Sequence, residues 1–588
     1  MSNSALTAAA RQPPLNWWRE AHAWAALLLV AATYLARLNQ PTLQGEETRR
    51  ALVAEEMLRT GDWIVPREQG LLFPDRPPLG NWSIALAQAI TGSRQPWAVR
   101  LPSVVATMLT AWLIYVYART FLSSLAAAAA ACAYGTLGQV LQLGRLAETE
   151  AVFTLLVAAS LLGWHLSWLR NWPHLAAWVV GYSFAGLAAL AKGPQGPLYF
   201  AGPVIVYLAL QRQWRRLFSW QHLVGLAAGA VVVGAWHVPY ARQVEGPVVL
   251  QTWGALAAAR FDYSRLTDVV GHLLTFPVEV FACLLPWSLL LWAYLSPTAR
   301  AALRHGPCQA RFLLLAIALA FATCWLAPQA RGRYLMPLYP CFCPLIALVI
   351  EHPMQNVAQT WQNAWRRFCS IAAVAVFMGG MAVLAAALAG SILARQHAAG
   401  IDWRGKAVWL GDLLSQPVWF AWGYFVAAVL AAMLAWHGRC CRPERAHACV
   451  FGLAAFLGLT YAGVVVNVQV HAQNDVAAAV ARVRRQIPPG ERLVSIGKAY
   501  HRFVYWYGEP IEVIDPQSAA APKGWRYFCF HQAGSHAAKL PFAYEEIAVI
   551  GCDRRRDEPL FDRVVVARRL DVTASPGEAV SGLGGPRR

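Results

Sequence analysis

Residues 150–192 read EAVFTLLVAASLLGWHLSWLRNWPHLAAWVVGYSFAGLAALAK. This stretch holds two apolar runs, 150–168 and 173–191, joined by a short polar link around Arg170. Each run has about the ~20 residues that an α-helix needs to cross the hydrocarbon layer of a bilayer. Two such runs with so short a link predict a helical hairpin inside a membrane.

The same pattern recurs along most of the chain. Of the 588 residues, 57% are hydrophobic and only 14% are charged, against roughly 25% charged in an average soluble domain. This composition excludes a disordered chain and argues against a soluble enzyme. We expect an α-helical multi-span membrane protein with about thirteen spans. They lie near 21–38, 97–119, 121–138, 150–168, 173–191, 195–211, 219–238, 271–294, 311–327, 334–350, 367–394, 417–436 and 446–468.

The basic residues orient these spans. The formal net charge is +19, and we attribute the excess to cytoplasmic loops rather than to a nucleic-acid partner, because Lys and Arg concentrate on that side of membrane proteins. With the N-terminus in the cytoplasm, the loops on that side carry many arginines and only two acids, Glu351 and Glu444. Thirteen spans then place the C-terminus outside. The arginines are Arg119, Arg170, Arg212, Arg215, Arg216, Arg300, Arg304, Arg311, Arg366, Arg367, Arg439, Arg442 and Arg445.

Two stretches are not predicted to span the membrane. Residues 39–96 form a long first outer loop with an interfacial helix over 46–59 and a second short helix over 79–90. We therefore assign 1–470 to a transmembrane domain that includes this loop. Residues 471–588 have the composition of a soluble α/β domain outside the membrane.

Within this C-terminal domain, segment 475–487 predicts a helix and five short runs predict strands. Cys529 and Cys552 are its cysteines, and both a disulfide and two buried free thiols are compatible with the sequence. The predicted strands are 491–496, 511–514, 525–530, 546–551 and 562–567.

Charged residues cluster at the predicted outer ends of the spans. Arg and Lys at this depth can hold phosphate oxygens by charge-assisted hydrogen bonds, and a carboxylate can serve as a base for an acceptor hydroxyl. The alternative is that these charges only end helices or pair with lipid headgroups. The loops concerned contain Glu46, Glu47, Arg49 and Arg50; Asp75 and Arg76; Arg145, Glu148 and Glu150; Lys192; and Arg331, Arg333 and Tyr334.

Other sequence signals narrow the chemistry. Glu279 falls in the eighth apolar run, where an ionisable residue is a functional candidate by default. No nucleotide-binding fingerprint or P-loop is visible, which favours a lipid-linked donor. No metal-ligand spacing is visible either, and the sequence leaves a need for a divalent metal open.

The first outer loop also carries a family resemblance. The segments EETRRA at 46–51, MLRTGDWIVP at 57–66 and RPPL at 76–79 resemble the first periplasmic loop of the aminoarabinose transferases of lipid A. These enzymes belong with the protein O-mannosyltransferases among the GT-C glycosyltransferases. Lys192-Gly193 and the RYLMP run at 333–337 are also similar to family features.

The resemblance implies an enzyme that moves a sugar, with inversion, from a polyprenyl phosphate to an acceptor on the periplasmic face. It implies an enzyme of the bacterial inner membrane, with lipid A or another lipopolysaccharide component as the acceptor. We expect a monomer. Glu46, beside Glu47, matches the family's essential acid after the first span, and Glu150 matches its second acid. Both positions are often Asp in the family, and Arg76 stands where Lys is frequent.

Roles follow for the remaining residues. Arg76, Lys192, Arg331 and Arg333 would hold the donor phosphate, while Arg49, Glu148 and Tyr334 are weaker substrate-binding candidates. Glu46 would be the base for a hydroxyl acceptor, or an orienting group for an acceptor phosphate that is already anionic. Two alternatives remain: a GT-C enzyme with a protein or other envelope-glycan acceptor, and a lipid or sugar transporter. The transporter would show broken helices with charges at the midplane and a sequence repeat, and no repeat is visible.

Overall fold

The computed structural model describes residues 19–244, 263–297, 306–355, 359–398, 418–473, 475–515, 524–533, 540–552 and 562–570, and a few single residues between 245 and 305. The chain divides into two compact units. A helical unit contains Pro74–His471 and the residues up to Gln40, and a second unit contains Pro41–Phe73 and the chain from Ala472 onward. The predicted division at residue 470 kept 41–73 with the membrane region, whereas these residues group with the C-terminal domain.

In the described part of the chain, ten helical segments are long and apolar enough to cross a membrane, and three further apolar helices are shorter. Together they account for the thirteen apolar runs. The shorter ones are α2 (Ala21–Leu35), α6 (Ser124–Gly135) and α10 (Gln195–Leu210). A helix of 15 residues such as α2 rises only about 22 Å, less than the ~30 Å hydrocarbon core. The chain is a helical multi-span membrane protein with ten to thirteen candidate spans.

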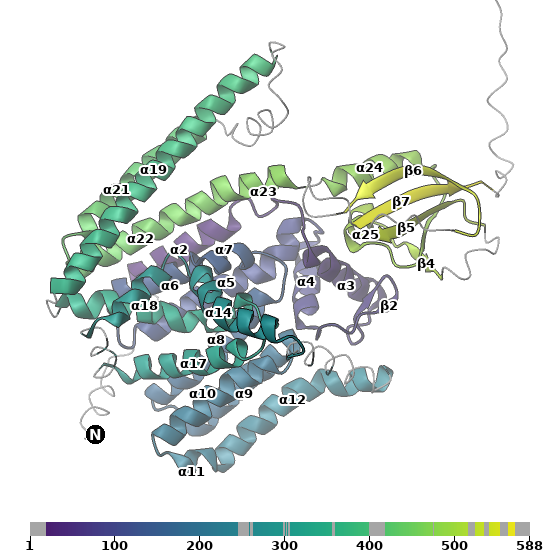
Figure 1. Ribbon diagram of the computed structural model, residues 1–588. Coiled ribbons are helices and arrows are strands. Elements are labelled where there is room, and N and C mark those ends of the chain that lie inside the picture. The colour runs from purple at the N-terminus through teal and green to yellow at the C-terminus, as the bar shows by residue number, and fades with distance from the viewer. Residues whose placement is uncertain are drawn as a thin grey trace, which may run out of the picture. The chain divides into compact units, whose positions relative to one another are not determined.

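The helices of this unit follow one another along the chain (Figure 1). They are α4 (Leu79–Thr91), α5 (Pro96–Ala118), α7 (Gly138–Leu143), α8 (Glu150–Leu169), α9 (His174–Lys192), α11 (Trp214–Leu217), α12 (Trp220–Gln243), α14 (Leu266–Cys283), α15 (Ser288–Leu291), η2 (Trp292–Leu295), α17 (Cys308–Trp325), η3 (Gly332–Leu338), α18 (Tyr339–Gln355), α19 (Gln359–Ala398), α21 (Val418–Gly438), α22 (Pro443–Thr460), η4 (Tyr461–Val465) and α23 (Val466–Ala472).

Two of the predicted spans are interrupted. The run 271–294 is divided after α14, where Pro286 lacks an N–H and restricts the residue before it, and it continues as the short α15 and η2. The run 334–350 begins with the 3₁₀ segment η3 and becomes α-helical only at Tyr339. Apolar periodicity marks such runs but not the points where the helix changes type.

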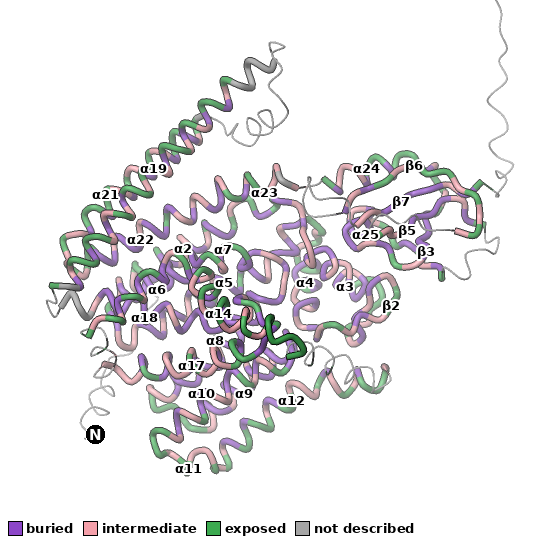
Figure 2. Tube along the Cα trace, in the orientation of Figure 1, coloured by how far each residue is buried: buried purple, intermediate pink, exposed green. Residues whose placement is uncertain are grey.

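Small residues let the helices of this unit approach one another closely. Alanines 126–131 of α6 are all buried, which is typical of a helix surrounded by protein. A Cβ at Gly181 of α9 would lie 2.3 Å from the ring of Phe200, and one at Gly225 of α12 would lie 2.8 Å from Trp178. Figure 2 shows the contrast with α19 and α21, which carry many exposed positions.

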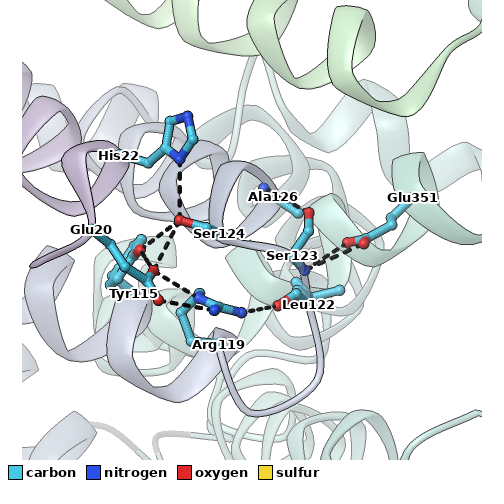
Figure 3. A network of polar contacts seen from close by, with 9 residues as sticks. All are labelled: Glu20, His22, Tyr115, Arg119, Leu122, Ser123, Ser124, Ala126 and Glu351. Carbon is cyan, nitrogen blue, oxygen red and sulfur yellow. Dashed lines mark hydrogen bonds and ion pairs between the residues drawn. The ribbon is translucent and has the colours of Figure 1, made fainter. Parts of the chain in front are cut away.

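A polar network fixes α2 at its N-terminal end (Figure 3). Both carboxylate oxygens of Glu20 accept hydrogen bonds from Arg119, at 2.9 Å each. One of them also accepts hydrogen bonds from the hydroxyls of Tyr115 and Ser124. The charge-assisted hydrogen bond from Arg119 is the main reason that the pKa of Glu20 falls from 4.5 to about 2.

We expect Glu20→Gln to lower the stability of the helical unit by about 1–2 kcal/mol, because two charge-assisted hydrogen bonds are weakened. A carboxyl whose folded-state pKa is lowered stabilises the protein above its ordinary value and loses that contribution as the pH falls toward about 2. Thermal unfolding of the detergent-solubilised protein at pH 7 should therefore show a lower midpoint for the variant. Equal midpoints would contradict this interpretation of the network.

The second unit is built around a five-stranded mixed sheet. The strand order is β4-β3-β5-β7-β6, with β3 parallel to β4 and β5 and with β7 antiparallel to its neighbours. The predicted helix and all five predicted strands are present. They are α24 (Val476–Gln486), β3 (Leu493–Ile496), β4 (Glu512–Ile514), β5 (Tyr527–Ala533), β6 (Tyr544–Gly551) and β7 (Asp562–Arg569). The sequence did not predict α25 (His501–Tyr507). Cys529 and Cys552 are both buried free thiols.

The first outer loop supplies the rest of this unit. Its helix α3 (Glu46–Thr60) and a hairpin of β1 (Arg67–Glu68) and β2 (Leu71–Leu72) belong with the sheet domain. The predicted helix 46–59 is thus present. Its Leu52 packs against the core that includes Phe503 and Val480, so part of its apolar face contacts protein.

Candidate active site

The predicted site residues fall into two groups, one in each unit. Glu148, Glu150, Lys192, Arg333 and Tyr334 meet in the helical unit. Glu46, Glu47 and Arg49 lie in the unit of the C-terminal domain.

The centre of the first group is an ion pair between Lys192 and Glu150. Lys192 is the last residue of α9 and Glu150 the first of α8, and these antiparallel helices bring the two ends together. The Lys192 Nζ lies 2.9 Å from Glu150 Oε1, and the two side chains are only 2% and 6% exposed. An acid in a first turn and a base in a last turn each complement the helix dipole. Gly193, at φ +92°, ends α9 in a conformation that glycine adopts readily.

Aromatic rings and a second ion pair surround Lys192. Its Nζ lies 5.1 Å from the centre of the Tyr334 ring and 5.5 Å from that of Phe153, within the range of a cation–π contact. Arg333 Nη1 lies 3.7 Å from Glu148 Oε2. Two cations and two carboxylates therefore pair with each other in this group.

Two residues that the sequence did not connect to the site hold the Arg333 segment. Glu279 of α14 accepts a hydrogen bond from the Gly332 N–H at 2.8 Å, and the Tyr199 hydroxyl donates one to the Tyr334 carbonyl at 3.1 Å. The position of Glu279 in an apolar run was the only signal available for it. The sequence carried no signal for Tyr199, because a tyrosine in an apolar helix usually packs in the protein interior.

Two of the four residues predicted to bind phosphate, Arg76 and Arg331, are not part of these ion pairs. Arg331 is exposed and Arg76 is half-buried. Neither side chain makes a hydrogen bond or ion pair with another residue in the part of the chain that the structure describes. Both guanidinium groups are thus available to an anion, whereas Lys192 and Arg333 would have to exchange a carboxylate for it.

The second group begins at the N-terminus of α3. Arg49 Nη1 donates to both carboxylate oxygens of Glu46, at 3.0 and 2.9 Å. Glu47 is fully buried and accepts a hydrogen bond from the Gln44 N–H at 2.9 Å. This N–H belongs to the residue before the N-cap Gly45, so Glu47 fixes the turn that leads into α3. Of the two adjacent acids, Glu46 is the one that is exposed at its side chain, by 44%.

Residues of the C-terminal domain adjoin this second group. The His501 Nδ1 lies 2.5 Å from the Thr48 hydroxyl, and Lys498 Nζ lies 2.6 Å from Glu68 Oε2. Burial first, and then the nearby Arg49, lowers the pKa of His501 well below its ordinary value, so that this histidine is neutral near pH 7. Among the described residues, no group of three His, Cys, Asp or Glu side chains is close enough to hold a metal ion.

Residues 75–238 match the family described as dolichyl-phosphate-mannose-protein mannosyltransferase (PMT_2). Two similar proteins are both undecaprenyl phosphate-alpha-4-amino-4-deoxy-L-arabinose arabinosyl transferases. The one from Pseudomonas aeruginosa LESB58 is 31% identical over 346 residues, which cover 56% of this chain and 59% of the relative. The one from Edwardsiella ictaluri is 29% identical over 436 residues, which cover 71% of this chain and 72% of the relative.

Solved structures agree in fold. The crystal structure of ArnT from Cupriavidus metallidurans in the apo state superposes with a TM-score of 0.65 at 15% identity, covering 94% of this chain and 98% of that one. The same protein bound to undecaprenyl phosphate gives 0.61 at 16% identity, with the same coverage. In fold, the chain is similar to these ArnT structures; in sequence, it is similar to the arabinosyl transferases named above and, over residues 75–238, to the mannosyltransferase family.

Proposed function

We propose that the chain is a glycosyltransferase that moves an aminoarabinose unit from undecaprenyl phosphate to lipid A, at the periplasmic face of the bacterial inner membrane. The observation that carries the proposal is the buried Lys192, placed between two aromatic rings at the end of a span, in a chain similar to the arabinosyl transferases named above. The positive-inside pattern supports a cytoplasmic N-terminus and a periplasmic C-terminal domain. We expect a monomer with no nucleic-acid partner.

On the donor side, Lys192, Arg76, Arg331 and Arg333 bind the phosphate. In the reaction the bond between the sugar C1 and the phosphate oxygen breaks, and its electron pair stays on that oxygen. An acceptor oxygen forms the new bond to C1 from the opposite face, which inverts the configuration. Cations that are already fixed in place stabilise the charge that develops on the leaving phosphate. When the donor binds, Lys192 exchanges Glu150 for a phosphate oxygen, and Tyr334 lines the donor pocket.

On the acceptor side, a phosphate of lipid A is already anionic near neutral pH, so it needs no base. Glu46 then acts as an orienting group: its two-oxygen contact with Arg49 fixes a guanidinium that can hold the acceptor phosphate. Glu47 supports this arrangement by accepting the Gln44 N–H, which fixes the turn just before the helix that carries both residues.

Mass spectrometry of lipid A tests the proposal. Lipid A from cells lacking the protein should lose a species heavier by one aminopentose, and the wild-type gene should restore that species whereas Glu46→Ala should not. Unchanged lipid A in the deletion strain would rule out this acceptor.

A second candidate acceptor is protein, because residues 75–238 match the mannosyltransferase family whose description names a protein acceptor. In that case the deletion strain would keep its lipid A and lose sugar that alkali releases from envelope proteins. The two analyses on the same cells separate the two acceptors.

A further inference from the structure

The first outer loop and the C-terminal domain are joined by contacts that converge on one short segment, residues 498–501. The Gln69 side chain donates from Nε2 to the Ala499 carbonyl at 2.9 Å and accepts from the Ala499 N–H at 3.1 Å. Thr48 contacts His501, and Glu68 contacts Lys498. Segment 498–501 follows β3, whose parallel neighbours are β4 on one side and β5 on the other. The carboxyl end of such a strand is where open α/β sheets commonly bind their ligands, and here the loop lies against it.

Glu68 is the central residue of this junction. Its side chain is only 1% exposed, and a buried carboxylate is costly unless cations compensate it. Two cations do so: Lys498 Nζ at 2.6 Å and Arg49 Nε at 3.5 Å, both measured to Oε2. Both cations also lie beside the same ring, that of Phe73, at 5.8 and 5.9 Å from its centre.

Arg49 extends the junction to the candidate site. Its Nε faces Glu68, while its Nη1 holds both oxygens of Glu46. Lys498, Glu68, Arg49 and Glu46 thus form a continuous chain of alternating charge from the C-terminal domain to the first turn of α3. Among the described residues, His501 also lies near both Arg49 and Lys498, and Tyr500, which stacks on His501, lies near Arg49.

We propose that Lys498 is a positioning residue for the acceptor. Lys498 compensates the buried negative charge of Glu68, and Glu68 in turn orients the Arg49 side chain. Arg49 and Glu46 then bind the acceptor in the correct orientation. The inference rests on the proposed function, in which Glu46 and Arg49 are the acceptor-side groups. It gives the C-terminal domain a defined part in the reaction. It also limits the effect of Lys498 to the acceptor, since the donor-phosphate cations belong to the other unit.

The test uses the purified full-length protein in lipid nanodiscs, with an undecaprenyl phosphate-aminoarabinose donor and lipid A as acceptor. We expect Lys498→Met to raise the KM for lipid A about tenfold, the effect of losing one charge-assisted contact, with the donor KM unchanged. Lys498→Arg should restore the wild-type value. A residue that only stabilised the fold would lower the active fraction, and therefore the apparent kcat, with neither KM altered.

Two further variants keep the test decisive. The double variant Lys498→Met with Glu68→Gln removes both charges, so it avoids an uncompensated buried carboxylate, and it should show the same rise in acceptor KM. Arg568→Met removes an exposed cation that pairs with Glu545 elsewhere in the domain, and it should match the wild type. A normal acceptor KM in both Lys498→Met and the double variant, or no recovery in Lys498→Arg, would overturn the inference.

Glu46→Gln separates the two hypotheses. If this variant is inactive while Lys498→Met behaves as wild type, the positioning role is wrong and the proposed function stands. If Glu46→Gln is fully active, the acceptor-side assignment fails, and the role of Lys498 fails with it.

Discussion

Lys192→Met should remove almost all transfer activity and also destabilise the helical unit by about 3–5 kcal/mol, because it leaves the carboxylate of Glu150 buried without its cation. The two side chains are 2% and 6% exposed, so water cannot replace the lost partner. In the proposed function the loss of activity has a separate cause, namely the loss of a fixed cation from the donor phosphate. Thermal unfolding and transfer assays on the purified variant measure the two effects.

A charge-neutral double variant distinguishes these two causes. Lys192→Met combined with Glu150→Gln removes both charges, and replacing a whole buried pair by neutral groups is often close to neutral in stability. We expect the unfolding midpoint to recover toward that of the wild type while transfer stays abolished. Recovery of activity together with stability would show that Lys192 has only a structural role and would remove it from the donor site.

Glu46→Gln should lower transfer about 100-fold, because an acceptor held even about 1 Å out of place can cost that much, while stability is nearly unchanged. The glutamine has the same shape but pairs poorly with Arg49. The side chain of Glu46 is 44% exposed, and ion pairs so accessible to water contribute at most about 1 kcal/mol. The measurement is the initial rate of sugar transfer at saturating donor.

Glu55→Gln is the matched control. Glu55 belongs to the same helix, α3, but nine residues further on, which at 100° per residue is the opposite face. It should transfer sugar at the wild-type rate. Equal losses in both variants would point to general damage to α3, and a fully active Glu46→Gln would contradict the assignment of Glu46 to the acceptor site.

Much of the fold could be predicted from the sequence, because the length and hydropathy of each apolar run indicate a membrane-spanning helix without reference to the rest of the chain. The runs 150–168 and 173–191 became α8 and α9 almost residue for residue. The short strand-like runs of the C-terminal domain likewise predicted β3 to β7, the five strands of its sheet in the described residues. By contrast, α25 has only seven residues, rich in aromatic side chains, which is too short for a helical period to show.

The candidate site was predictable only in part. The charges at the span ends indicated Glu150 and Lys192 because ionisable residues beside apolar runs are conspicuous. Their pairing depends on how α8 and α9 align, which the sequence does not display. Lys498 and Glu68 were missed for a stronger reason: a salt bridge between residues so far apart in the chain leaves no local pattern, and each residue alone resembles an ordinary surface charge.

The same separation has a consequence for synthesis. Two hydrogen bonds join Gln69 to Ala499, and these residues are 430 positions apart in the chain. At ~5–20 residues per second, the ribosome needs roughly 20–90 s to travel that distance. The loop that contains α3 is therefore synthesised long before its partner segment, and the intervening helices are inserted in between. It can reach its final conformation only after the C-terminal part of the chain has been synthesised. A nascent chain stalled before β3 would hold Glu68 without Lys498, and α3 without the helix α25 on which it packs.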